Sequence, residues 1–442
     1  MGDGGRLTSA YADALSLVQS AAASGWLAAL RRDAFASFEG LGFPTTRNED
    51  WHFTSVTPIV ERMFRAPAAR APTSSISPND LATLVIGNPS WHRLVFLNGR
   101  FEPGLSAFSG LPAAVRVMTL PESLRSSPEF AAQHLGKLAG YRKDTFTALN
   151  TALMQEGVVV HVPPDAVVDE PIHIVHVADA RSAGVAMHPR LLMVVEPRAQ
   201  VAIIESYAGI GNETYFTNAV AEIEVGDGAR VHHYKIQRES SEAFHVGTVQ
   251  VSQGRDSVYH SFSYAAGASL SRTNVYTRLQ GAGAEVRLNG LYMVDGTQHA
   301  DHQTFVEHLA PACASRELYK GILDGSSHGV FNGKVYVDPV AQKTDGKQTN
   351  HALLLSEHAR VDTKPQLEIF ADDVKCTHGA TVGRLDQASL FYLKSRGIGA
   401  EHARALLTYA FAAEVLESIE VDTLREGLER LAFERFTAGD QH

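Results

Sequence analysis

The sequence predicts a mainly β protein, in which a parallel β-helix is flanked by an N-terminal and a C-terminal helical region. Three observations support this fold class. Short runs rich in β-branched and aromatic residues follow one another from about residue 156 to 386. A loose motif recurs among these runs at nearly constant spacing. Before and after them, in 1–155 and 387–442, apolar residues recur with the period of a helix.

The N-terminal region, 1–155, is expected to be mostly helical. The helical period stops at "EGLGFP" (39–44), whose glycines and proline end a helix. "APAARAPTSSISP" (66–78) has the composition of a linker. In "RLVFLNGRF" (93–101), Asn-Gly between apolar runs predicts a hairpin. A further helical stretch is expected from about 127 to 155.

The central region, 156–386, predicts the β-helix. Its runs include "VVVHVP", "IHIVHV", "QVAIIES" and "KVYVDP", separated by Gly, Asp, Asn and Pro turns. The recurring motif places Val201, Val231, Val258 and Val286 at spacings of 30, 27 and 28 residues. A period of this size is typical of a solenoid in which each coil stacks on the last. A β-sandwich is the alternative, but a sandwich rarely sustains so many strands without splitting into domains.

The last region, 387–442, predicts helices with two apolar faces. These faces are made by Leu406, Phe411 and Val415 and by Leu424 and Leu428. Two such helices cannot bury both faces alone, so they are expected to pack on each other, on the end of the solenoid, or on a partner. A solenoid also needs caps at its ends, and the flanking helical regions are suited to supply them.

Composition and charge exclude several classes of protein. The 442-residue chain has a formal net charge of −10, so it lacks the basic footprint of a nucleic-acid or anionic-membrane binder. No apolar run approaches the ~18 residues of a membrane-spanning helix, and the N-terminus lacks a secretory-signal pattern. Two cysteines cannot form a disulfide framework, which indicates a cytoplasmic protein. No Gly-Lys pair has the glycine spacing of a Walker A loop, which excludes ATP binding by that route.

The stretch "DDVKCTHGATVG" (372–383) contains the main candidate site. Cys376 and His378 are two residues apart, so on a strand they would share a face. They supply two ligands, whereas structural zinc and common iron–sulfur clusters need about four. A buried cysteine beside a hydrogen-bonded histidine, and a thiol nucleophile with its base, are the alternatives. The adjacent Asp372 and Asp373 would point to opposite faces, which argues against a glycosidase-type carboxylate pair.

A second group of candidates lies in "QHADHQTFVEH" (298–308), which contains His299, His302 and His308. His302 and His308 are an even number of residues apart and would share a strand face. We expect these histidines to be either packed or exposed to solvent. A transient iron path is the sharper alternative.

Three stretches resemble the SufB/SufD family of the SUF iron–sulfur cluster assembly system, and its SufD branch in particular. The longest is "TNHALLLSEHARVDTKPQLEIFADDVKCTHGATVGRLDQASLFYLKSRGI" (349–398). Upstream, "RELYKGILDGSSHGVFNGKVYV" (316–337) is similar to the same family, and "PTTRNEDWHFT" (44–54) resembles its N-terminal signature. The resemblance touches most of the chain and is densest between about 300 and 415.

This resemblance implies a right-handed parallel β-helix between helical parts and a non-enzymatic scaffold role. It implies two partners: SufB, paired through the β-helix, and the ATPase SufC, docked on the C-terminal helices. ATP hydrolysis would then belong to SufC, and isolated chains of this family could also pair as homodimers.

Cys376 and His378 match the family's cysteine and histidine at the SufB–SufD junction. There a SufB cysteine would complete the site for a transient iron–sulfur cluster or iron, and this chain alone would hold none stably. A β-helix enzyme that uses Cys376 and His378, or acidic residues, on a small or carbohydrate substrate is the alternative function.

Overall fold

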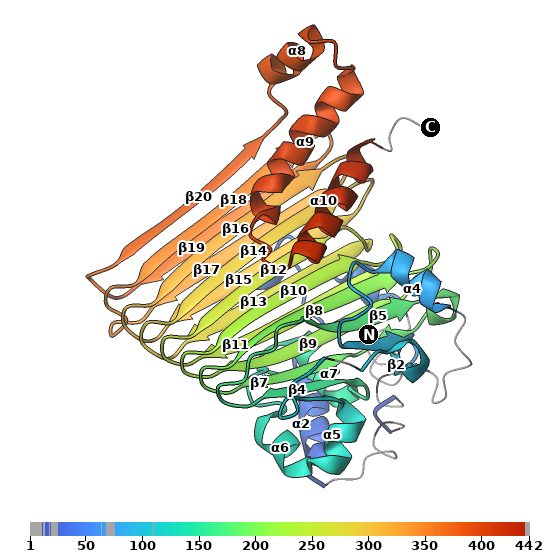
Figure 1. The fold of residues 1–442 in the computed structure, drawn as a ribbon, viewed down its shortest axis with the longest axis vertical. Coiled ribbons are helices and arrows are strands. Elements are labelled where there is room, and N and C mark those ends of the chain that lie inside the picture. Colours follow the sequence, from blue (N-terminus) through green and yellow to red (C-terminus); the bar gives the residue numbers. More distant parts are fainter. Residues whose placement is uncertain are drawn as a thin grey trace.

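The computed structural model describes residues 25–62, 64–67, 76–108 and 110–437, together with 11, 14–16 and 18. Two long sheets run through this part of the chain, and helices precede and follow them in the sequence (Figure 1). Successive core strands alternate between the sheets and pair in parallel, so the chain winds as a parallel β-solenoid. The predicted fold class is confirmed, and a β-sandwich is excluded because its strands would pair antiparallel.

The strands of the first sheet are β1 (Arg93–Leu97), β2 (Arg100–Phe101), β5 (Ile172–Ala178), β8 (Gln200–Gly209), β10 (Arg230–Arg238), β12 (Val258–Ala265), β14 (Glu285–Val294), β16 (Ala314–Leu323), β18 (Asp345–Leu354) and β20 (Lys375–Gly383). The strands of the second sheet are β3 (Arg116–Thr119), β4 (Gly157–Val162), β6 (Ala186–Met187), β7 (Arg190–Val195), β9 (Phe216–Val225), β11 (Phe244–Gln253), β13 (Leu270–Leu279), β15 (His299–His308), β17 (His328–Val337) and β19 (Arg360–Ile369). The first sheet has the order β2-β1-β5-β8-β10-β12-β14-β16-β18-β20 and the second β19-β17-β15-β13-β11-β9-β7-β4-β3, with β6 beside β9.

The helices before the solenoid core are α2 (Gly25–Leu41), α3 (Thr57–Val60), α4 (Pro78–Leu84), α5 (Leu120–Ser126), α6 (Pro128–His134) and α7 (Thr145–Leu153). The helices after it are α8 (Gln387–Ser395), α9 (Ala400–Leu416) and α10 (Asp422–Thr437). The expected break at residues 39–44 is present, because α2 ends at Leu41 and Gly42 follows with a φ of 65°. The expected linker falls largely on 68–75, outside the described residues.

Neighbouring coils stack in register, and this register fixes which side chains fill the interior. Val201, Val231 and Val286 lie in one row across β8, β10 and β14 and belong to one buried cluster. The fourth member of this row is Tyr259, which pairs with both Val231 and Val286. The motif's assignment of Val258 is therefore wrong by one residue, and a slip of one residue turns a side chain to the opposite face of the sheet.

The chain itself closes the end of the solenoid nearest the N-terminal region. β1 and β2 form the predicted hairpin, in which Phe96 pairs with Phe101. Asn98 and Gly99 adopt φ values of 51° and 73°, as a two-residue hairpin turn requires. β1 also pairs in parallel with β5, and β3 pairs antiparallel with β4. Both sheets therefore end here in short strands, which leave little unpaired edge.

A buried arginine holds the N-terminal signature, 44–54, against the outer face of the second sheet. Arg272 of β13 donates to Asp301 Oδ2 of β15 at 2.6 Å and to the carbonyl of Asp50 at 2.7 Å. Its guanidinium carbon lies 3.7 Å from the centre of the Trp51 ring. Thr54 donates its hydroxyl proton to the same Asp301 oxygen at 2.6 Å. One buried ion pair thus binds several residues of the signature.

The helices α9 and α10 lie across the outer face of the first sheet (Figure 1). Lys320 of β16 fixes α9, because its ammonium donates to the carbonyl of Phe411 at 2.8 Å and pairs with Glu414. The same ammonium lies 4.4 Å from the centre of the Phe411 ring. α8, by contrast, extends beyond the last strands and buries none of its residues. Among the described residues, no helix combines the length and the apolar character needed to cross a membrane.

Breaking the Arg272–Asp301 pair should destabilise the fold strongly. We expect Arg272→Ala to lower the free energy of unfolding by about 3–5 kcal/mol, because the buried Asp301 carboxylate loses its partner. Arg278→Ala is the matched control, since Arg278 joins the same two strands through Glu307 at 2.8 Å but is exposed. Its loss should cost about 1 kcal/mol or less. Urea denaturation measures both values, and equal losses would contradict the proposed anchoring.

Candidate functional site

The last coil of the solenoid, made by β19 and β20, is open on the side that faces away from the preceding coils. Each strand pairs with the preceding coil, β19 with β17 and β20 with β18, and stands at the edge of its sheet. Residues of β19 and β20 are half-buried or exposed, in contrast to the buried interiors of the preceding coils. No described segment covers this end, so one row of backbone donors and acceptors on each strand is free to pair with another chain.

Cys376 and His378 lie on this last coil and share one face of β20. They stand opposite Gly346 and Gln348 of β18. A Cβ atom on Gly346 would lie 3.3 Å from the Sγ of Cys376 and 3.4 Å from the Oγ of Ser315, so the thiol faces the solenoid interior. His378, two residues along the strand, belongs to the same inward row but is exposed because no further coil covers it.

The Cys376 thiol is not set up as a nucleophile. Burial raises its pKa, and the nearby Asp345 carboxylate adds to this shift. A nucleophilic cysteine needs the opposite shift, toward the thiolate at neutral pH. The hydrolase alternative therefore has no support in the electrostatics of this thiol.

A row of buried polar side chains continues inward from His378. Gln348 donates from Nε2 to Glu317 Oε1 at 3.2 Å, and both residues are buried. The Gln348 side chain crosses above Gly333 of the facing sheet, where an added Cβ would come within 2.1 Å of its Nε2. Only glycine at residue 333 leaves this space. Burial raises the pKa of Glu317 to about 7, although hydrogen bonds from Thr304 and Gln348 oppose the shift.

The three histidines of β15 do not form one site. His299 faces outward, where its Nε2 lies 2.8 Å from the hydroxyl of Thr54. His302 and His308 face inward and are buried, but six residues of strand place them about 20 Å apart. Burial lowers the pKa of all three to about 4, so each is neutral at pH 7.

The residues expected to dock a partner through the C-terminal helices are placed differently from one another. Val415, Leu424 and Leu428 are fully buried against the first sheet, so they hold the helices on the solenoid and do not face a partner. Leu406 and Phe411 are half-buried. The expectation is corrected for the three buried residues, because the helices use those side chains to cover the apolar outer face of their own sheet.

Two features of this end were missed by the sequence analysis. The Glu317–Gln348 row was missed because charged and amide residues at alternate strand positions are typical of a solvent-facing side. The second feature is α8, whose Phe391 and Tyr392 are 73% and 57% exposed. The sequence signal for this feature is a pair of adjacent aromatic residues in a helix that buries no apolar face against the solenoid. Such an exposed aromatic pair indicates a surface that contacts another molecule.

Fold and site together define a class of protein: a parallel β-solenoid whose open last coil carries a cysteine–histidine pair. A family model described as the SUF system FeS cluster assembly SufBD core domain matches residues 176–411. A second, the SufBD protein N-terminal region, matches residues 4–174. The chain belongs to the SufBD family of the SUF iron–sulfur cluster assembly system.

Curated relatives agree with this family. The chain is 36% identical to an iron–sulfur cluster assembly SufBD family protein of Synechocystis sp., over 89% of this chain and 88% of the relative. It is 33% identical to the iron–sulfur cluster assembly protein SufD of Escherichia coli, over 87% of each chain. It is 30% identical to SufD of Bacillus subtilis over 64% of each chain. The resemblance to the SufD branch is thereby confirmed.

The raised pKa of Glu317 predicts a specific dependence of stability on pH. Between the ordinary pKa of 4.5 and about 7, the unfolded chain loses this proton while the folded chain keeps it, so folding stability falls as pH rises. The glutamine of Glu317→Gln cannot ionise. We therefore expect the free energy of unfolding of this variant to rise by up to about 3 kcal/mol relative to that of the parent protein as pH rises through this window. Denaturant unfolding of both proteins at about pH 5 and pH 8 measures the difference. A difference that does not change with pH would refute the shift.

Proposed function

We propose that this chain is a non-ATPase scaffold subunit of the SUF machinery, which pairs with SufB, docks the SufC ATPase, and takes part in iron acquisition and nascent cluster assembly. The observation that carries the proposal is the open last coil bearing Cys376 and His378. The membership of this chain in the SufBD family indicates the process in which it takes part, iron–sulfur cluster assembly. The chain has two cysteines, which supports a cytoplasmic location.

The open coil fits pairing with a second solenoid. Its unpaired strand edges offer main-chain hydrogen bonds, the mode of recognition in which one chain extends the sheet of another. Large apolar side chains are exposed around it: Val340, Ile369, Phe370 and Val382. An exposed edge flanked by apolar residues is an aggregation hazard unless a partner covers it. SufB is the proposed partner, and a homodimer is the proposed state of the isolated chain.

The pair on β20 is half of a ligand set. Cys376 offers a thiol that loses its proton when it binds metal, and exposed His378 offers an imidazole beside it. The remaining ligands would come from the partner, and a SufB cysteine is the proposed main sulfur donor. The cluster or iron held there is transient cargo, and none is held stably by this chain alone. The enzyme alternative is disfavoured, because the thiol pKa is raised and not lowered.

The proposed docking surface for SufC is α8 together with the neighbouring part of α9. Phe391 and Tyr392 are exposed, while Leu406 and Phe411 are half-buried. Helix-in-groove recognition uses such apolar anchors on a helix that its own chain does not cover. The buried faces of α9 and α10 keep this surface attached to the solenoid.

Substituting His378 tests the shared site. We expect His378→Ala to lower the iron and sulfide that co-purify anaerobically with the SufB–SufC complex by about tenfold or more, since loss of one ligand weakens a metal site at least as much as loss of an outer-shell partner. The fold and the complex should be unaffected, because this imidazole is exposed.

His358→Ala is the matched control, because His358 is exposed in the turn between β18 and β19 at the same end of the molecule. Cys376→Ser should have an effect equal to or smaller than that of His378→Ala, and Cys313→Ser none. Wild-type iron and sulfide in the His378→Ala complex would rule out the shared site.

A second experiment tests the docking surface. We expect the double variant Phe391→Ser/Tyr392→Ser to weaken SufC binding about tenfold or more while SufB pairing persists, because exposed aromatic anchors often carry most of an interface's energy. Phe108→Ser is the control, since Phe108 is 59% exposed but belongs to the N-terminal region. Titration calorimetry with purified SufC measures both. Unchanged affinity in the double variant would assign docking elsewhere.

A further inference from the structure

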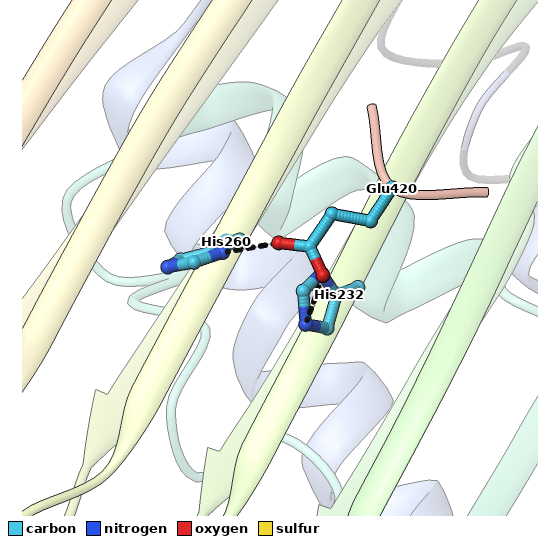
Figure 2. A group of neighbouring side chains, drawn as sticks. All are labelled: His232, His260 and Glu420. Carbon is cyan, nitrogen blue, oxygen red and sulfur yellow. Dashed lines mark ion pairs between the residues drawn. The ribbon is translucent and has the colours of Figure 1, made fainter. Parts of the chain in front are cut away.

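Two histidines and a glutamate meet outside the solenoid, far along the chain from Cys376. His232 of β10 and His260 of β12 are register partners on adjacent strands, and their rings lie 5.1 Å apart. Glu420, in the connection between α9 and α10, extends its carboxylate between the two rings (Figure 2). Two of the donors come from neighbouring strands and the third from a loop. The loop reaches the strands because α9 and α10 pack on the first sheet.

The separations suit a shared cation better than direct hydrogen bonds. His260 Nδ1 lies 3.4 Å from Glu420 Oε1, and His232 Nε2 lies 3.6 Å from Glu420 Oε2. Good hydrogen bonds of this kind measure about 2.7–3.2 Å. Metal–ligand bonds of about 2.0–2.1 Å place two donors of a tetrahedral site about 3.3 Å apart. With one donor atom taken from each of the three residues, the three atoms lie within 4.8 Å of one another.

The position of Glu420 is fixed by its own backbone and neighbours. Its amide donates to the hydroxyl of Tyr234 on β10 at 3.3 Å. The preceding Ile419 is fully buried in the cluster between the helices and the first sheet. Because the backbone is held at this point, the carboxylate is confined near the two rings without being buried itself.

The surroundings keep the imidazoles neutral and leave room for a further ligand. Burial lowers the pKa of His232 and of His260, so both offer uncharged nitrogen lone pairs at neutral pH. Two arginines act on the rings: Arg230 and Arg287 both lower the pKa of His232, and Arg287 also lowers that of His260. Arg287 is paired with Glu285 at 2.7 Å, which offsets part of its charge. A cavity of about 190 Å³ borders His260 and Glu420, large enough for several waters.

We propose that His232, His260 and Glu420 bind one divalent transition-metal ion of the zinc or ferrous class. Two imidazoles and one carboxylate with an open fourth position are the donor set that such ions prefer, whereas calcium and magnesium prefer oxygen ligands throughout. A bound ion would tie the α9–α10 connection to the first sheet, and so stabilise the helices that carry α8. The site is independent of the cluster site proposed at Cys376 and His378.

The test uses the full-length chain carrying Cys376→Ser and His378→Ala, so that the open coil contributes no ligands. We expect this background to bind one equivalent of Zn²⁺ in titration calorimetry, and Zn²⁺ to raise its melting temperature by mass action. Adding Glu420→Ala, or His260→Ala, should weaken Zn²⁺ binding by about 100-fold or more, since even outer-shell partners are worth up to that much. Ca²⁺ should neither bind at this site nor shift the melting temperature.

Glu417→Gln is the matched control, because Glu417 lines the same cavity but is not among the three donors. It should bind Zn²⁺ like the background protein. Thermal melting without metal confirms that each variant is folded. Because Glu420 is exposed, Glu420→Ala is less apt to disturb the fold than His260→Ala. Equal Zn²⁺ affinity and stoichiometry in the background and in Glu420→Ala, or no Zn²⁺ binding by the background at micromolar concentration, would overturn the proposal.

Discussion

Parallel stacking of the coils in register is the constraint on which the rest of the structure depends. Every inner strand exchanges backbone hydrogen bonds with a coil on each side, so coil spacing, interior rows and turn positions are set together. Among the described strands, only those of the first and last coils lack a neighbour on one side. The hairpin β1–β2 and strand β3 finish the first coil, whereas β19 and β20 leave the last one unfinished. The cysteine–histidine pair lies where this pattern of satisfied hydrogen bonds stops.

Features with a local signal could be predicted from the sequence, and features set by a neighbouring coil could not. The Asn-Gly hairpin, the helical periods and the spacing of the coils are local. The interior place of Tyr259, by contrast, depends on how two other strands pair with it. The inward Glu317 and Gln348 depend on the space above Gly333. The burial of the C-terminal helical faces depends on a sheet whose Lys320 lies 91 positions before Phe411 in the sequence.

Both proposed metal-binding groups are built where two separately formed surfaces meet. At the open coil, the second surface would belong to another chain, so occupancy of the proposed site would depend on assembly. Outside the first sheet, the second surface is the connection between α9 and α10, so occupancy of the proposed site would depend on packing within the chain. The first proposed site would therefore be suited to passing an ion on and the second to keeping it, because a site shared between chains opens whenever the chains separate.

The inequality of the two ends also limits how many molecules can associate. A rod with two open ends adds further rods at both and grows into a fibre, as strand-edge pairing does in cross-β aggregates. Here one end is blunt, since β2 has two residues and β3 has four. Pairing through the strand edges of the last coil would therefore join two rods and leave no long strand edge for a third, whether the second rod is identical or related. Because one end offers long unpaired strand edges and the other does not, this mode of pairing would give a dimer and not an end-to-end polymer.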